Sequence, residues 1–138
     1  MRETKKYVIQ RHERQDEPAH WDLMLENGTV LETYRVCLPP EDWGVKPVEA
    51  VRIFDHPLKF LSYEGSVNKG KGRVEIADCG IYCVLEQDDK RQLLEFSGKI
   101  LNGKFVMAQT KNAEWNFSRS IAGEDGLFKT PGCQVRPG

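Results

Sequence analysis

Apolar and polar residues alternate over short segments along most of the sequence, and each segment ends at a turn signal. The segments cover residues 6–12, 20–26, 29–36, 48–57, 73–86, 93–101, 104–110 and 114–120. Alternation with a period of two places successive side chains on opposite faces of a strand. No segment carries the sustained apolar period of about 3.6 residues that an amphipathic helix needs. Seven or eight short strands with regular turns predict an all-β fold, an antiparallel sandwich or a barrel-like domain.

The first hairpin is predicted by Asn27-Gly28, which lies between two apolar runs. This dipeptide is the strongest short-range signal for a β-hairpin. If both residues form a two-residue loop, Arg35 lies directly opposite His20 and on the same face of the sheet.

Two further glycines are expected to shape the second half of the chain. Asn102-Gly103 predicts another hairpin, because it also separates two apolar runs. Gly80 interrupts segment 73–86, so two short strands are expected there rather than one.

The length and net charge of the chain limit the class of protein to which it can belong. A chain of 138 residues fits one domain, and we expect it to cover residues 1–122, with residues 123–138 as a flexible C-terminal tail. A net charge of −1 excludes a strongly basic surface but leaves room for a local basic groove. No apolar run reaches the length of a membrane span, and no signal peptide is visible. The cysteines form no CxxC pair, which favours reduced thiols in a cytoplasmic protein: Cys37, Cys79, Cys83 and Cys133.

The segment HWDLMLE places a histidine and a carboxylate on one strand face. His20 and Asp22 project together, while Trp21 and Leu23 point into the expected core. His12 ends the preceding strand, and the connecting loop can bring it beside His20. Two imidazoles and one carboxylate suit a divalent transition metal and leave coordination positions open for water or substrate. The same residues also fit a simple solvated pair on an exposed strand, so both interpretations stay open.

The third histidine lies in the segment FDHP, at the end of an expected strand. Strict alternation would place Arg52, Phe54 and His56 on one face, with Asp55 on the other. A strand end is a common place for a functional side chain. The alternative interpretation is a surface histidine that caps a turn.

Several ordered motifs together resemble the 3′-phosphoesterase domain of bacterial and archaeal DNA ligase D, and the stand-alone relatives of that domain. They are YVIQRH, HWDLMLENGTVLETYRV, VRIFDHPLKFLSYEGSV, KGRVEIADCGIY, GKILNGKFVMAQT and EWNF. The resemblance implies a β-barrel-like fold with an active-site groove on one side. It implies a prokaryotic, cytoplasmic DNA repair hydrolase that trims a 3′-ribonucleotide or a 3′-phosphate from DNA ends. It also implies a divalent cation, most often Mn with Zn or Co as alternatives, and a DNA ligase or end-joining proteins as partners.

The resemblance assigns roles to individual residues. The histidine of the family motif Q-x-H matches His12, and the histidine and aspartate of H-Y-D match His20 and Asp22. These three are the metal ligands that the resemblance implies. The histidine of E-D-H-P matches His56, a phosphate contact. His56 and His20 are therefore the catalytic candidates.

Two residues of the quoted motifs depart from the family pattern, and the first departure concerns phosphate binding. The family arginine of H-Y-D-x-R-L-E is Met24 here, and the tyrosine of D-H-P-L-x-Y is Phe60. Losing a charge-assisted phosphate contact removes roughly 1.5–3 kcal/mol of stabilisation. We expect Arg35 or Arg52 to supply the replacement cation, because alternation places both on the face of the candidate site.

Three functions are compatible with this pattern. The first is a metal-dependent phosphoesterase that acts on 3′ ends of nucleic acid. The second is a catalytically weakened relative that keeps the metal and binds a nucleic-acid end or a partner without efficient hydrolysis. The third is a β-barrel that binds a small phosphorylated ligand and has no role on DNA.

Overall fold

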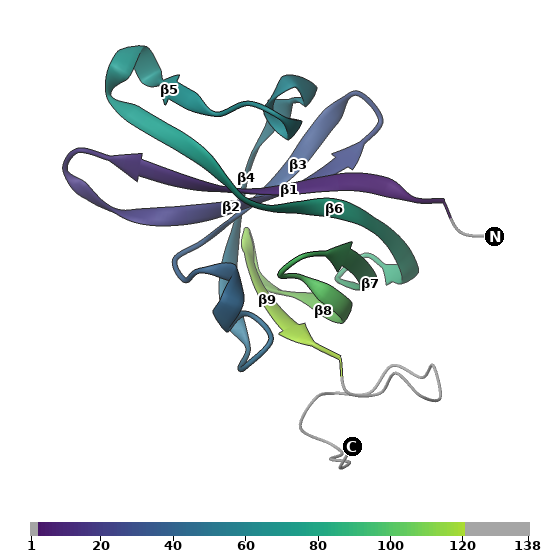
Figure 1. Ribbon diagram of the computed structural model, residues 1–138. Helices are drawn as coiled ribbons and strands as arrows, with labels where there is room; N and C mark the ends of the chain where they lie inside the picture. The colour runs from purple at the N-terminus through teal and green to yellow at the C-terminus, as the bar shows by residue number, and fades with distance from the viewer. Residues whose placement is uncertain (1–2, 121–138) are drawn as a thin grey trace.

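Residues 3–120 are described by the computed structural model, and they form an antiparallel β-structure (Figure 1). The strands are β1 (Lys5–Arg14), β2 (Glu17–Asn27), β3 (Val30–Val36), β4 (Val48–Pro57), β5 (Gly65–Val67), β6 (Gly72–Asp88), β7 (Arg91–Gly98), β8 (Asn102–Lys111) and β9 (Glu114–Arg119). Three short 3-10 helices connect them: η1 (Pro40–Asp42), η2 (Leu58–Leu61) and η3 (Asn68–Gly70). The all-β prediction is confirmed. The expected tail, residues 123–138, lies outside the described residues.

The strands close into a ring. Their order is β1-β2-β3-β4-β9-β8-β7-β6, and β1 pairs with β6 to join the two ends, while β5 adds to the beginning of β6. All pairings are antiparallel. The sheet is barrel-like because the pairing of β1 with β6 closes it. The closed end of the β1–β2 hairpin and the short strand β5 project on the same side of the molecule (Figure 1). This side carries the candidate site described below.

The expectation of two short strands around Gly80 is wrong, because β6 is one strand of 17 residues. Gly80 pairs with Tyr7 of β1 on one side and with Gly98 of β7 on the other. A Cβ at position 80 would collide with the carbonyl oxygen of Ser97 and would come within 2.9 Å of the Cα of Gly98. Gly80 therefore does not interrupt the strand but permits β6 and β7 to approach each other closely.

Both predicted hairpins form, but their loops lie elsewhere. Asn27 pairs with Val30, so Gly28 and Thr29 form the first loop, and Gly28 takes a φ of +67°. The loop lies one residue later than predicted, which shifts the cross-strand pairing by two and places Arg35 opposite Asp22 instead of His20. The face is unchanged, because the strand period is two.

In the second hairpin Ser97 pairs with Asn102, so Asn102 and Gly103 begin β8 rather than form the loop. The loop before β8 is fixed by the carboxylate of Asp78. Its oxygens accept hydrogen bonds from the backbone N–H groups of Lys99 and Leu101 at 3.0 and 2.9 Å.

The interior of the ring holds the main hydrophobic core, and every ring strand contributes to it. Leu23 is buried in this core and Trp21 packs against it, as the alternation in β2 predicted. Aromatic rings fill much of the space: Phe105 and Phe117 stack with centroids 4.9 Å apart. Trp43, from the segment after η1, packs edge-on against Phe117, and its indole N–H donates to the carbonyl of Leu38 at 2.8 Å.

A second, smaller core lies on the outer face of β1, β2 and β3. Its buried residues are Val8, Met24 and Leu31. Leu58, Phe60, Leu61 and Ile76 pack against them, so η2 covers this face of the sheet. Met24 thus continues the row of His20 and Asp22 as a packing residue.

Two observations complete the fold. Within residues 3–120 no helix is long and apolar enough to span a lipid bilayer. Cys37, Cys79 and Cys83 are free thiols, as expected, and Cys133 lies outside the described residues.

Candidate active site

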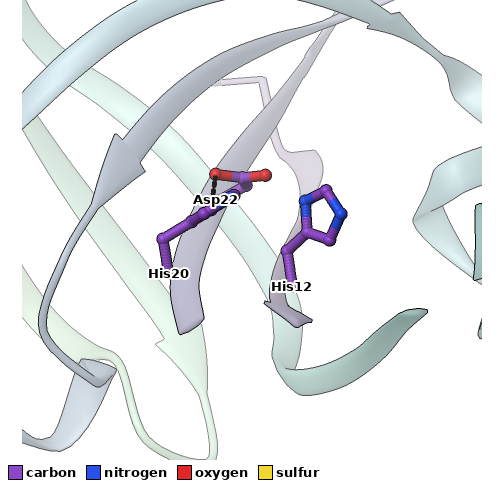
Figure 2. Close-up of side chains that lie close together, drawn as sticks. All are labelled: His12, His20 and Asp22. Atoms are coloured by element: carbon purple, nitrogen blue, oxygen red, sulfur yellow. Dashed lines mark hydrogen bonds and ion pairs between the residues drawn. The ribbon is translucent and has the colours of Figure 1, made fainter. Parts of the chain in front are cut away.

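His12, His20 and Asp22 meet on the outer face of the β1–β2 hairpin (Figure 2). His12 of β1 is directly opposite His20 of β2, and Asp22 follows on the same face of β2. One potential ligand atom of each residue lies within 4.8 Å of the others. The two imidazole rings have centroids 4.7 Å apart at an interplanar angle of 74°. The structure therefore brings together the three residues that the sequence predicts as metal ligands.

The hydrogen bonds of this cluster set the proton positions. His20 and Asp22 are 6% and 3% exposed, and His20 Nδ1 lies 3.0 Å from Asp22 Oδ1. An ionised carboxylate only accepts, so Nδ1 carries the proton of the neutral ring and Nε2 carries the lone pair. A carboxylate that orients a histidine in this way is common at metal sites.

Two buried nitrogens of the cluster have no hydrogen-bond partner within the described residues. They are Nε2 of His12 and Nε2 of His20. A buried polar atom without a partner costs about 1–3 kcal/mol, and such atoms are rare in folded proteins. One ligand atom from each imidazole and one carboxylate oxygen of Asp22 lie within 4.8 Å of one another, so the cluster could hold a divalent cation. The donor set of two imidazoles and one carboxylate thus fits the metal that the sequence predicts.

A glycine of the closing strand makes room for His12. A Cβ at Gly72 of β6 would lie 2.9 Å from His12 Nε2 and 3.2 Å from the carbonyl oxygen of Glu13.

Burial lowers the pKa of His12 below its usual value, and the neighbouring His20 lowers it further. The neutral, metal-binding form of the ring is therefore favoured.

His56 reaches the same face through a β-bulge in β4. Thr33 pairs with Ile53 and Leu31 pairs with His56, so β4 has one residue more than β3 between these pairs. The bulge moves His56 into register with the face that carries Asp22 and Arg35. It also breaks the strict alternation from which Arg52 and His56 were expected to share a face.

The ring of His56 is fixed by two hydrogen bonds at Nδ1. The carbonyl oxygen of Phe54 lies 3.1 Å away and can only accept, so Nδ1 carries the proton. Thr33 Oγ1 lies 2.9 Å away and donates its own proton to the carbonyl of Leu31. Nε2 is then the nitrogen of the neutral ring that can accept a proton. Burial lowers the pKa of His56, although the carboxylate of Asp22 partly opposes the shift.

The two candidate arginines lie on opposite faces of the sheet. Arg35 pairs with Asp22 across the β2–β3 ladder, and its Nε lies 3.5 Å from Asp22 Oδ1. Arg52 pairs with Tyr34, a residue of the main core, and its guanidinium lies 5.5 Å from the centre of that ring. Arg52 also binds Asp55 Oδ1 at 2.7 Å. The structure brings Arg35 to the site, and it does not bring Arg52 there.

A groove of about 520 Å³ joins these groups. Two of the candidate ligands, His12 and Asp22, line it, whereas His20 is not among the lining residues. The full lining is Gln10, His12, Arg14, Asp22, Met24, Arg35, Phe54, His56, Pro57, Phe60, Val67, Asn68 and Val74. Because His12, Asp22, His56 and Arg35 face the same space, one phosphate group could contact several of them. The arrangement can bind a phosphate ester beside a cation and move a proton at His56 Nε2.

Sequence reasoning missed two residues that support the site. Gln10 is 1% exposed, and its Nε2 donates to the carbonyls of Phe60 and Tyr63 at 3.1 and 2.9 Å, which holds η2 over the sheet. Thr33 is fully buried and orients His56. A usable signal was present for both, since Gln10 is the glutamine of the motif Q-x-H and Thr33 lies two residues before Arg35 on the same face.

The sequence model of the DNA ligase D 3′-phosphoesterase domain matches residues 10–109. The chain belongs to this family. The matched range contains the five residues proposed for the candidate site, His12, His20, Asp22, Arg35 and His56.

Two curated relatives agree with the family match. The multifunctional non-homologous end joining protein LigD of Mycolicibacterium smegmatis is 29% identical over 124 residues, which cover 80% of this chain and 16% of that protein. The protein of the same name from Pseudomonas aeruginosa is 31% identical over 137 residues, covering 86% of this chain and 15% of that protein. The chain therefore spans less than a fifth of the length of these members of the DNA ligase D family.

Proposed function

We propose that the chain is a divalent-metal-dependent phosphoesterase that removes a 3′-phosphate or a 3′-ribonucleotide from DNA ends in end-joining repair. One observation carries the proposal: two imidazoles and a buried carboxylate each offer one ligand atom within 4.8 Å of the others, and two of these three residues line a groove together with His56 and Arg35. Family membership supports the reaction class, and the names of the relatives support a role in DNA end joining. A DNA ligase and other end-joining proteins are the proposed partners.

The proposed cation ligands are His12, His20 and Asp22. Mn is the first choice, with Zn and Co as alternatives, because imidazole and carboxylate donors suit all three. A bound divalent ion would polarise the phosphate and lower the pKa of a bound water. Asp22 would serve twice, since Oδ1 orients the His20 ring and the other oxygen can face the cation.

Arg35 is the proposed replacement for the missing family arginine. Met24 pairs with Thr33, and Arg35 follows Thr33 by two residues on the same face of β3. A long guanidinium from the neighbouring strand can therefore reach the space that a side chain at position 24 would serve. The contact it would make with a phosphate oxygen is charge-assisted and bidentate.

His56 is the proposed proton carrier. Its Nδ1–H bond to the Phe54 carbonyl directs proton exchange to Nε2. Burial favours the neutral ring in the free protein, whereas a bound anionic phosphate would favour the imidazolium. His56 would then donate a hydrogen bond to the phosphate and pass the proton to the leaving oxygen.

The test is a turnover assay with the metal supplied. The protein is incubated with Mn and with duplexes that end in a 3′-phosphate or a 3′-ribonucleotide, beside a His20→Ala control. Turnover by the wild type that the control lacks supports the proposal. Metal-dependent binding of these ends without turnover supports the second candidate, a weakened relative, which Met24 and Phe60 favour. If the protein neither binds nor hydrolyses these ends, the proposal is refuted and a small phosphorylated ligand becomes the better candidate.

A further inference from the structure

One aromatic side chain of the groove is exposed to solvent. Phe54 is 72% exposed, and among the aromatic residues of the described range 3–120 it alone belongs to the exposed class. It lies in the bulge of β4 and lines the groove together with His56 and Arg35. A single exposed apolar residue is ordinary on a protein surface. Phe54 differs from such a residue because it lies beside His56, the candidate phosphate contact.

The ring of Phe54 is held in a defined orientation. It stacks on the His56 ring with centroids 4.7 Å apart and an interplanar angle of 15°. His56 is itself fixed by Thr33 and by an edge-on contact with Phe60, whose centroid lies 5.7 Å away. One face of Phe54 is therefore covered by a rigid partner, and the high exposure leaves the remaining surface of the ring to solvent.

We propose that Phe54 forms the stacking surface for a nucleobase at the 3′ end of the substrate strand. The proposal rests on the proposed function. It adds a contact with the terminal nucleobase, a part of the substrate that the candidate phosphate site does not contact. A flat, exposed ring next to a phosphate contact matches the chemistry of a nucleotide, in which a planar base lies one sugar away from its phosphate. Stacking on an aromatic side chain accepts any base, so no strong base preference is expected.

The charges of the groove support a nucleic-acid ligand over an uncharged aromatic one. Arg14 and Arg35 line the same space as Phe54, and both can attract phosphates of the strand. The family pattern E-D-H-P reads FDHP in this chain, so the aromatic ring is a departure from that pattern. A chain with methionine at position 24, where the resemblance implies a phosphate-binding arginine, would regain affinity through the base.

The experiment compares the binding of DNA ends with and without a terminal base. Two duplexes with a short single-stranded 3′ tail and a 3′-phosphate are prepared, one with a normal terminal nucleotide and one with an abasic terminal nucleotide. Their Kd values are measured by fluorescence anisotropy without a divalent cation, so that turnover does not interfere. Phe54→Ala is expected to weaken binding of the normal duplex roughly 5- to 150-fold and to leave the abasic duplex almost unchanged.

Three further variants separate stacking from packing. Phe54→Leu keeps apolar bulk on His56 but lacks a π face, so it should lose the preference for the base. Phe54→Trp should keep the preference, and its fluorescence should be quenched by the normal duplex only. Val45→Ala is the matched control, because Val45 is 78% exposed and does not line the groove. It should bind both duplexes as the wild type does.

The outcomes distinguish the two proposals. If Phe54→Ala weakens both duplexes equally, Phe54 acts through His56 and the stacking proposal is overturned while the proposed function stands. The stacking proposal is also overturned, and the proposed function stands, if Phe54→Ala has no effect on the binding of either duplex by a protein that hydrolyses 3′-phosphate ends. If the wild type neither binds nor hydrolyses either duplex, both proposals are overturned together.

Discussion

Replacing Arg35 by alanine tests how this chain compensates for the missing family arginine. The substitution removes the cation that lies 3.5 Å from Asp22 and lines the groove. A charge-assisted contact is worth about 1.5–3 kcal/mol, and the Arg35 side chain is 37% exposed, so screening places its effect at the lower end. A loss of about 1.5–2 kcal/mol corresponds to a kcat/KM that is roughly 10- to 30-fold lower.

The assay measures release of phosphate from a 3′-phosphorylated duplex at saturating Mn, with the Kd for Mn measured in parallel. Arg35→Lys should recover part of the activity, because lysine keeps the charge but lacks the planar fork. Arg52→Ala is the control on the opposite face: it should lower the melting temperature, because the bond to Asp55 is lost, and change kcat/KM less than about twofold. The reasoning is refuted if Arg52→Ala reduces kcat/KM more than Arg35→Ala, or if Arg35→Ala has wild-type activity.

Four other predictions follow from the described contacts. Mn should stabilise the protein against unfolding by about 2.7 kcal/mol at 100 times its Kd, and chelation or His20→Ala should abolish this gain in a thermal melt. Gly72→Ala should weaken Mn binding roughly 10- to 100-fold in a calorimetric titration, because its Cβ meets His12 Nε2; unchanged affinity would contradict the role given to Gly72. Asp78→Asn should destabilise the fold by about 3 kcal/mol in urea unfolding, since the carboxylate accepts from Tyr7 and from the backbone before β8, whereas Tyr7→Phe should cost only about 1 kcal/mol. Burial lowers the pKa of His56, so the unfolded chain takes up its proton first as the pH falls through about 6.5; the metal-free protein should lose stability there, and His56→Asn should make this loss smaller when unfolding is measured on both sides of that pH.

Local alternation was sufficient to predict the faces of β1 and β2. His20 and Asp22 project together because they are two positions apart on one regular strand, and His12 meets them because the hairpin pairs it with His20. The hairpin loop after β2 was misplaced by one residue, which shifts the cross-strand pairing by two, and Arg35 stayed on the predicted face because a shift by an even number preserves it. These features depend on short sequence separations, where propensity and periodicity are informative.

The features that the sequence did not predict depend on irregularities and on distant partners. The bulge in β4 places Arg52 and His56 on opposite faces, and nothing in the segment FDHP indicates that β4 has one residue more than β3 at this point. Met24 could be placed in the row of His20, but its role as a core residue requires η2, which packs on it from beyond β4. Gly72 is part of the site only because β6 returns to β1.

The strand β1 has a consequence for the order in which structure can form. His12 pairs with His20 of β2 and, on its other side, with Val74 of β6, so the same residue belongs to a local ladder and to the ladder that closes the ring. The first of these contacts spans a short hairpin, whereas the second joins segments about sixty residues apart and forms late in a chain of high contact order. A partly folded chain can therefore bring the two imidazoles together before the pocket around them is complete. High affinity for a cation is expected only after β1 has paired with β6. Closure of the ring and cation binding are therefore coupled during folding.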